Sequence, residues 1–280
     1  MSTQAIVSEL QATSGALEAP LAQDVLHHLY GAMLKARLLA QRLGLADQYA
    51  EAIFAGALQN ISGTDLIAST QTNPVLEVLR GGELSQFLRK KNDNAIVAKQ
   101  KVVVADTSSF VDTAAGMAIT GLRGGSDSVV IVFAEGRSTV GARFERACSF
   151  ADRNGLPVII LADWTGSRKS SRNHDGRNLL HWPFPTIAVD GRDVIAVYRV
   201  TKEAISAARR GHGPTLVDCV NFPAPGGHGR DERDPVATYR RYLQRHQAWS
   251  DLLHSELVVK YKQEIGKTRF ARNSRAEEHS

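Results

Sequence analysis

Hydrophobic positions change their spacing near residue 100, and this change divides the chain into differently patterned regions. Residues 18–57 place apolar side chains about 3.6 residues apart, with alanines between them, which predicts helix. Residues 64–69 predict a short strand. Residues 72–94 predict two short helical pieces, interrupted at Gly81 and Gly82.

From residue 100 onward, apolar runs alternate with helical patterns. The predicted strands are rich in Val and Ile and cover residues 101–106, 128–134, 156–163, 186–191 and 214–222. The helices between them cover residues 110–122, 137–153 and 193–210. Asp193 is a predicted N-cap, and Gly155 and Gly211 are predicted helix ends. This alternation is typical of an α/β fold, in which helices cover both faces of a parallel sheet.

The same patterns give three regions of the chain. Residues 1–99 form a helical amino-terminal extension, residues 100–235 the α/β core, and residues 236–280 a carboxyl-terminal region. The last of these has an amphipathic helical pattern over 236–265, and we expect its final dozen residues to be disordered. We expect one compact domain in all.

Composition narrows the class of protein. The net charge of +5 is scattered, apart from a cluster at 168–177 and the carboxyl-terminal tail, and is no nucleic-acid signature. No apolar run approaches the ~18 residues of a membrane span, and residues 1–15 lack a basic segment followed by an apolar core. Cys148 and Cys219 have the apolar surroundings of buried thiols in a reducing compartment. We therefore expect a cytoplasmic protein that binds neither nucleic acid nor membranes.

Polar residues follow several predicted strands at their carboxyl ends, where open parallel sheets bind ligands. Glu135 and Asp163 each end a strand, and His228 lies in a later glycine-rich loop. Taken singly these signals are weak, because an acid after a strand is often a helix cap and a lone histidine is usually structural. Their spacing strengthens them. A carboxylate with a second oxygen ligand about 30 residues later suits Mg²⁺ bound to a diphosphate.

The turn after Glu135 adds to this prediction. A helix beginning at Gly136 would direct its first amide groups at the same phosphates. Arg137 follows the acid directly and could supply positive charge. The basic segment 167–177 could do the same, although a solvated surface loop is the favoured interpretation of that segment.

Four stretches carry a resemblance to a known family: 114–121, 133–145, 156–165 and 189–241. They resemble the α subunits of thiamine-diphosphate-dependent 2-oxo acid dehydrogenases, the E1 components of pyruvate and branched-chain complexes. "FAEG" at 133–136 is similar to the family's strand-GDG-helix pattern, and 189–222 is the most family-like stretch. "GGHGRDERDP", containing His228, is similar to a loop beside the family's active site.

The resemblance implies a thiamine-diphosphate-binding fold with thiamine diphosphate and Mg²⁺ as cofactors. The implied metal ligands are Glu135 and Thr165, with Asp163 as a nearby substitute. The implied cofactor-binding residues also include Gly136, Arg137 and His228, and His228 would stabilise intermediates in catalysis. The implied partners are a β-type E1 subunit, in a heterotetramer, and a lipoylated acyltransferase core.

Several departures from the family pattern leave two main functions open. Ala134 and Glu135 replace a glycine and an aspartate, and Trp164 and Thr165 replace two asparagines. Residues 69–73 are neutral where the family carries a tyrosine-arginine pair. One hypothesis is an E1-type α subunit with an altered magnesium-diphosphate site. The other is a non-catalytic relative, a scaffold or regulatory subunit that has lost the cofactor. Binding of another phosphorylated ligand is a third, weaker option.

Overall fold

A six-stranded sheet, with all of its strands parallel, forms the centre of the protein. The computed structural model describes residues 20–45, 50–82, 102–165, 184–220 and 234–266. The strand order is β2-β1-β3-β4-β6-β5. In chain order the strands are β1 (Leu66–Ser69), β2 (Val103–Val104), β3 (Val130–Glu135), β4 (Val158–Asp163), β5 (Thr186–Asp190) and β6 (Thr215–Val220). The predicted parallel sheet is confirmed.

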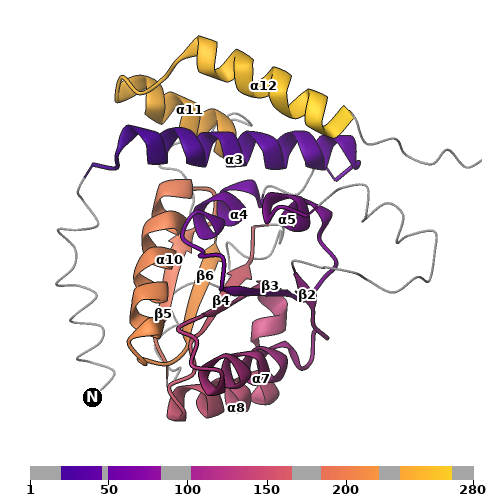
Figure 1. Ribbon diagram of the computed structural model, residues 1–280, viewed down its shortest axis with the longest axis vertical. Coiled ribbons are helices and arrows are strands. Elements are labelled where there is room, and N and C mark those ends of the chain that lie inside the picture. The colour runs from indigo at the N-terminus through magenta and orange to yellow at the C-terminus, as the bar shows by residue number, and fades with distance from the viewer. Residues whose placement is uncertain (1–19, 46–49, 83–101, 166–183, 221–233, 267–280) are drawn as a thin grey trace, which may run out of the picture.

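Helices cover both faces of this sheet, as predicted (Figure 1). On one face, α7 (Phe110–Arg123) and α8 (Ala142–Arg153) pack on residues such as Val130 and Val132. On the other, α4 (Glu51–Leu58) and α10 (Val194–Arg209) pack on Ile131 and Phe133. Neighbouring residues of β3 enter opposite cores because side chains alternate across a strand. The continuous apolar runs in the sequence follow from this double burial.

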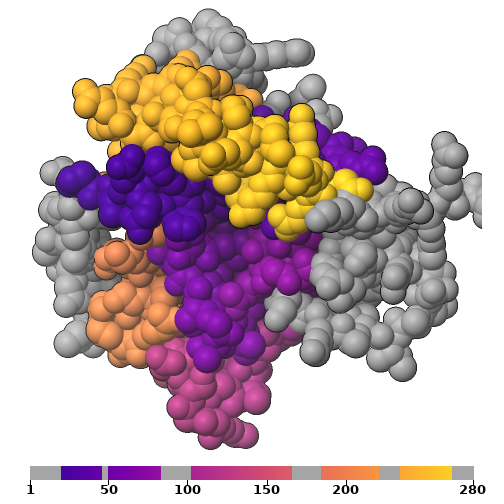
Figure 2. Space-filling view, turned by 45° about the horizontal axis from the view of Figure 1, so that its top comes forward, coloured from indigo at the N-terminus to yellow at the C-terminus, as the bar shows by residue number. Residues whose placement is uncertain are grey.

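Three further helices form an outer layer beyond α4. These are α3 (Gln23–Arg42), α11 (Pro235–Arg245) and α12 (Asp251–Gly266), and Figure 2 shows α12 lying across α3. The sequence predicts one helical region over 18–57 and another over 236–265, and the structure divides each of them in two. The second division falls where Gln247 adopts a positive φ of 55°, between α11 and α12.

Local capping explains where several helices begin. The Asp193 carboxylate accepts hydrogen bonds from the backbone amides of Ile195 and Ala196 at 2.9 and 3.1 Å, so the predicted cap of α10 is confirmed. The predicted helix end at Gly211 also holds, because this residue has a φ of 79° just after α10. The short α5 (Pro74–Leu79) begins at Asn73, whose side chain accepts from the Leu76 amide at 3.0 Å.

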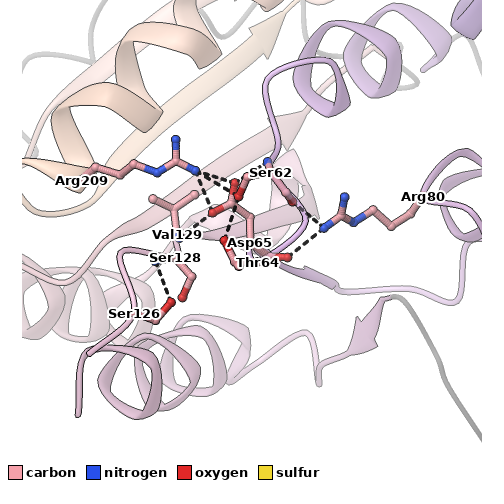
Figure 3. Close-up of polar contacts among 8 residues, drawn as sticks. All are labelled: Ser62, Thr64, Asp65, Arg80, Ser126, Ser128, Val129 and Arg209. Carbon is pink, nitrogen blue, oxygen red and sulfur yellow. Dashed lines mark hydrogen bonds and ion pairs between the residues drawn. The ribbon is translucent and has the colours of Figure 1, made fainter. Parts of the chain in front are cut away.

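At the amino edge of the sheet, a buried carboxylate ties β1 to β3 and α10 (Figure 3). Asp65 accepts from the amides of Ser62 and Val129 at 2.7 and 3.0 Å. Its side chain is fully buried, and Arg209 at the end of α10 lies 2.7 Å from it. Arg80 holds the same turn from α5, because it donates to the carbonyls of Ser62 and Asp65 at 2.8 and 3.0 Å. Burial alone would raise the pKa of the Asp65 carboxyl. The hydrogen bonds from Val129, Ser62 and Arg209 to the ionised carboxylate outweigh that effect and lower the pKa.

A second charge cluster fastens the outer layer to α4. Arg37 of α3 forms a two-pronged pair with Asp234, with both contacts at 2.9 Å, and its Nε donates to Glu51 at 2.8 Å. Glu51 begins α4 and is buried, while Asp234 caps α11 through the amides of Val236 and Ala237. One guanidinium therefore joins helices from both ends of the chain.

Both cysteines are buried in the sheet's two cores, as the sequence predicts. Cys148 lies in the core under α7 and α8, and Cys219 lies in the core under α4 and α10. Burial raises the pKa of each thiol. Within the described ranges, no helix combines the length and the apolar character that a bilayer crossing requires.

Replacing Asp65 should destabilise the protein without affecting the carboxyl edge of the sheet. We expect Asp65→Asn to lower the free energy of unfolding by about 3 kcal/mol, the low end for breaking a buried pair, because Arg209 stays partly hydrated. Urea denaturation measures this. Asp112→Asn is the matched control, because Asp112 and Arg143 form an exposed pair at 3.5 Å. Equal losses of unfolding free energy in Asp65→Asn and Asp112→Asn would contradict the role of Asp65 as a buried carboxylate that stabilises the fold.

The same carboxylate gives a pH dependence with a defined sign. The pKa of Asp65 is lower in the folded chain than its ordinary 3.8, so its stabilisation is fully present above that value. It is lost as the pH falls through the depressed pKa of the folded state. The difference in the free energy of unfolding between wild type and Asp65→Asn should therefore be smaller below pH 4 than at pH 7, as measured by urea denaturation at each pH. A difference that stayed constant with pH would contradict this.

Removing the Arg37 guanidinium should separate the outer layer from α4. We expect Arg37→Met to lower the free energy of unfolding by roughly 3–5 kcal/mol, because two partly or fully buried carboxylates lose their partner. Lys35→Met is the control from the same helix, since Lys35 pairs at 2.6 Å with the half-exposed Glu264. The control should change stability by less than about 1 kcal/mol in the same urea titration.

Candidate functional site

A cleft of about 330 Å³ opens at the carboxyl ends of β1, β3 and β4. Ile53 and Phe54 of α4 form one wall, and Phe54 meets Phe133 of β3 edge to face at 5.5 Å. The polar lining comes from the strand ends and the segments that follow them: Ser69, Thr70, Gln71, Asn73, Glu135, Arg137, Asp163 and Thr165. Five of the six residues predicted for the site therefore line or adjoin one cleft, including Gly136.

The parallel ladder brings the two predicted carboxylates together. Glu135 and Asp163 are Cα partners in the pairing of β3 with β4. Paired residues of parallel strands point to the same face of a sheet, here the face of Phe133 and Leu161, which α4 covers. Thr165 lines the same cleft. The oxygen-bearing side chains that the sequence singled out thus converge.

Within the described parts of the chain, the Glu135 carboxylate has two light attachments. The Gln71 amide donates to its Oε1, and the Arg137 Nε lies 3.4 Å from its Oε2. The side chains of Glu135 and Arg137 are 42% and 79% exposed, so this ion pair is weak. Arg137 also lines a neighbouring cavity of about 510 Å³ between the start of α7 and α8. The carboxylate is therefore accessible from the cleft.

Asp163 is held differently. Its Oδ1 accepts two hydrogen bonds from Thr165, one from the backbone amide at 2.7 Å and one from the hydroxyl at 2.6 Å. Burial raises the pKa of the Asp163 carboxyl, the bonds from Thr165 oppose that rise, and the charge of Glu135 adds to it. Asp163 thus fixes the direction of the Thr165 hydroxyl proton.

The helix predicted to begin at Gly136 does not do so, and that part of the prediction is wrong. Residues Gly136–Thr139 form a single 3₁₀ turn, η1, and α8 begins only at Ala142. Gly141, between them, has a φ of 103°, a backbone conformation that an α-helix cannot continue through. The amide end of α8 therefore starts six positions later along the chain than expected.

Predictions on later segments have mixed outcomes. His228 and the basic segment 167–177 lie outside the described residues, so the roles predicted for them stay predictions. Asp234, six positions after His228 in the sequence, caps α11 and pairs with Arg37. Among the residues that the structure describes, no three His, Cys, Asp or Glu side chains gather as a metal-binding group.

Sequence reasoning missed two contacts at this site. The contact between Gln71 and Glu135 joins residues 64 positions apart, and no local pattern marks it. The pairing of Arg37 with Glu51, which anchors the helix on the cleft wall, did leave a signal. Arg37 falls on the apolar stripe of α3, and a charge at such a position needs a buried partner.

Comparison with known proteins agrees with this geometry. The Dehydrogenase E1 component family model matches residues 51–279. The 3-methyl-2-oxobutanoate dehydrogenase subunit alpha of Mycobacterium tuberculosis is 30% identical over 171 residues, which cover 53% of this chain and 47% of the relative. The 2-oxoisovalerate dehydrogenase subunit alpha of Bacillus subtilis is 26% identical over 185 residues, covering 57% and 56%.

A third relative extends the comparison to another substrate class. The pyruvate dehydrogenase E1 component subunit alpha of Staphylococcus aureus is 27% identical over 177 residues, covering 54% of this chain and 47% of the relative. The chain spans about half the length of each of these relatives. The family match includes β1 to β6, the cleft and both of its carboxylates. The chain belongs to the dehydrogenase E1 component family, as an E1 α-type chain.

Proposed function

We propose that this chain is the α-type subunit of a thiamine-diphosphate-dependent 2-oxo acid dehydrogenase, with an altered magnesium-diphosphate site. The observation that carries the proposal is the convergence of Glu135, Asp163 and Thr165 on one cleft at the carboxyl edge of the sheet. The names of the three relatives support the reaction class, since each is the alpha subunit of a 2-oxo acid dehydrogenase.

The side chains present are compatible with Mg²⁺, even though two of them differ from the family's. The Thr165 hydroxyl donates a hydrogen bond to Asp163 and so keeps both oxygen lone pairs for a cation. Phosphate-binding loops hold magnesium with a serine or threonine hydroxyl and an aspartate in this way. The weak, exposed pair with Arg137 leaves Glu135 accessible to a divalent ion. We therefore assign Glu135 and Thr165 as ligands, with Asp163 orienting Thr165.

The chain's own residues would bind and orient the diphosphate end of the cofactor. Arg137 places a cation beside the cleft, and Gln71 and Asn73 supply amide donors. Ile53 and Phe54 exclude water from the inner wall. When bound, thiamine diphosphate supplies the carbanion that attacks the 2-oxo carbon. A β-type chain would complete the site in a heterotetramer, and a lipoylated acyltransferase would receive the acyl group.

A non-catalytic relative is the second candidate, and one contact favours it. In this structure the Glu135 carboxylate is engaged by Gln71 and Arg137, both of them protein donors. Residues 69–73, from which Gln71 comes, carry no charge that could bind a phosphate. A scaffold that had lost the cofactor would have no need of an open carboxylate. Binding of the cofactor decides between the two functions.

Isothermal titration of thiamine diphosphate with Mg²⁺ should detect micromolar or tighter binding to the full chain, alone or co-expressed with a β-type partner. Glu135→Ala and Thr165→Val should each weaken it about 10- to 100-fold, the usual cost of disturbing a metal site. Glu256→Ala, an exposed carboxylate on α12, is the control and should bind as wild type does. If folded protein gives no heat of binding, either alone or with the β-type partner, the catalytic function is contradicted and the scaffold function remains.

Arg137→Gln should change metal and anion binding in opposite directions. Removing a positive charge 3.4 Å from Glu135 should strengthen binding of Mg²⁺ alone and weaken binding of inorganic pyrophosphate, each about two- to fivefold. Titrations at low ionic strength measure both affinities, because salt screens exposed charges. Arg143→Gln, which removes a similarly exposed arginine paired with Asp112, should leave Mg²⁺ affinity unchanged. Changes of the same sign for both ligands would contradict the assigned position of Arg137.

A further inference from the structure

The indole of Trp164 lies directly against the α-carbon of Gly136. A β-carbon built at residue 136 would be 2.1, 2.2 and 2.5 Å from the indole Cδ2, Cε2 and Cγ atoms. Such distances are far below van der Waals contact, so no side chain fits at this position while the indole stays in place. The glycine that follows Glu135 therefore has a reason within the protein, apart from any ligand.

The other end of the indole is fixed to a buried carboxylate. Its Nε1 donates to Oδ1 of Asp218 at 3.1 Å, and Asp218, in β6, is 5% exposed. Trp164 follows β4 and its amide donates to the Cys219 carbonyl at 3.0 Å. The ring thus extends from the end of β3 across β4 to β6. Within the described residues, these two hydrogen bonds and the close contact with Gly136 help to hold the ring in position.

This ring packs on the face of the sheet opposite Glu135 and Asp163, and Trp164 also reaches the lining of the cleft. Trp164 packs against the core that α7 and α8 cover, together with Ala134 and Ala162. Glu135 and Asp163 follow Phe133 and Leu161 on the α4 face. Among the described residues, the turn after β3 contacts the Trp164 indole on one side. Its other contacts are light: the Glu135 amide donates to the Thr70 hydroxyl at 3.4 Å, and the Glu135 carboxylate meets Gln71 and Arg137.

We propose that Trp164 is a positioning residue, which sets the backbone at Glu135 and Gly136 so that the Glu135 carboxylate stands in the cleft. The inference rests on the proposed function, because it assigns Glu135 to the ligand. Flat contact with Gly136 limits the turn to a narrow range of backbone positions. Asp218 prevents the ring from rotating away. The tryptophan that replaces a family asparagine thus acts on Glu135 through the backbone of Gly136.

The first test separates positioning from simple core packing. Trp164→Ala in the full chain, with its β-type partner where binding requires one, should weaken thiamine diphosphate and Mg²⁺ binding about tenfold or more, as loss of a supporting residue typically does. Met117→Ala is the control for core packing, because Met117 packs partly buried on the same core as Trp164. It should lower the melting temperature and leave affinity within about twofold. Equal loss of affinity in both variants would overturn the proposal.

Conservative variants add a readout that packing alone would not change. Asp218→Asn keeps an oxygen acceptor for the indole and should retain the wild-type affinity. Trp164→Phe keeps a ring against Gly136 but loses the hydrogen bond to Asp218. Its ligand affinity should therefore lie between those of wild type and Trp164→Ala. Trp164 fluorescence, recorded in a background that carries both Trp182→Phe and Trp249→Phe so that Trp164 is the remaining tryptophan, should change when the ligand binds. An affinity that follows melting temperature across all these variants would reduce Trp164 to a structural role.

A double-mutant cycle tests the contact without any ligand. Gly136→Ala should lower the melting temperature by several degrees in the wild-type background, because its β-carbon meets the indole. Gly136→Ala in a Trp164→Ala background should lower the melting temperature much less, since the indole that would meet the new β-carbon is absent. Additive effects would overturn the proposal at its structural step. If instead the cycle is coupled but wild type binds no cofactor, the proposed function fails and the positioning role fails with it.

Discussion

The hydrogen-bonded register between β3 and β4 is the constraint on which the rest of the site depends. It pairs Val130 with Val158 at one end and Glu135 with Asp163 at the other. Because both faces of these strands are buried, a slip of one residue would turn every side chain into the wrong core. The register therefore cannot shift without unfolding, and the two acidic residues meet as a direct result. The cleft opens beside this pair.

The carboxylates at the two edges of the sheet differ in burial and in the number of hydrogen-bond donors that they receive. At the amino edge, Asp65 is buried and receives two amides and a guanidinium, so its charge is fully used in holding β1, β3 and α10 together. At the carboxyl edge, Glu135 is partly exposed, and its carboxylate contacts among the described residues are a weak ion pair with Arg137 and one hydrogen bond from the Gln71 amide. A carboxylate with spare acceptor capacity in a cleft is the arrangement that a ligand or a metal ion can use. The contrast separates the residues that stabilise the fold from those available for chemistry.

How far the sequence predicts this structure depends on the range of each interaction. Strands rich in Val and Ile, the N-cap at Asp193 and the helix end at Gly211 are local or periodic, and the structure bears them out. The order of the carboxyl strand ends also follows from the fold class, so Glu135, Asp163 and Thr165 could be brought together in advance. The break at Gly141 was missed because a glycine with positive φ leaves no mark on hydrophobic periodicity. The Arg37 cluster and the stacking of Trp164 on Gly136 join segments far apart in the chain, which a single sequence does not pair.

The placement of the two cysteines has a consequence for how the opening of this fold can be followed. Cys148 and Cys219 lie in the two separate cores, one on each side of the sheet, and burial keeps both thiols protonated. Alkylating reagents react with the thiolate, so neither sulfur is modified while its own core stays closed. Each thiol therefore reports on one layer of helices. In a timed labelling experiment read by mass spectrometry, the order of modification gives the order in which α8 and α10 leave the sheet.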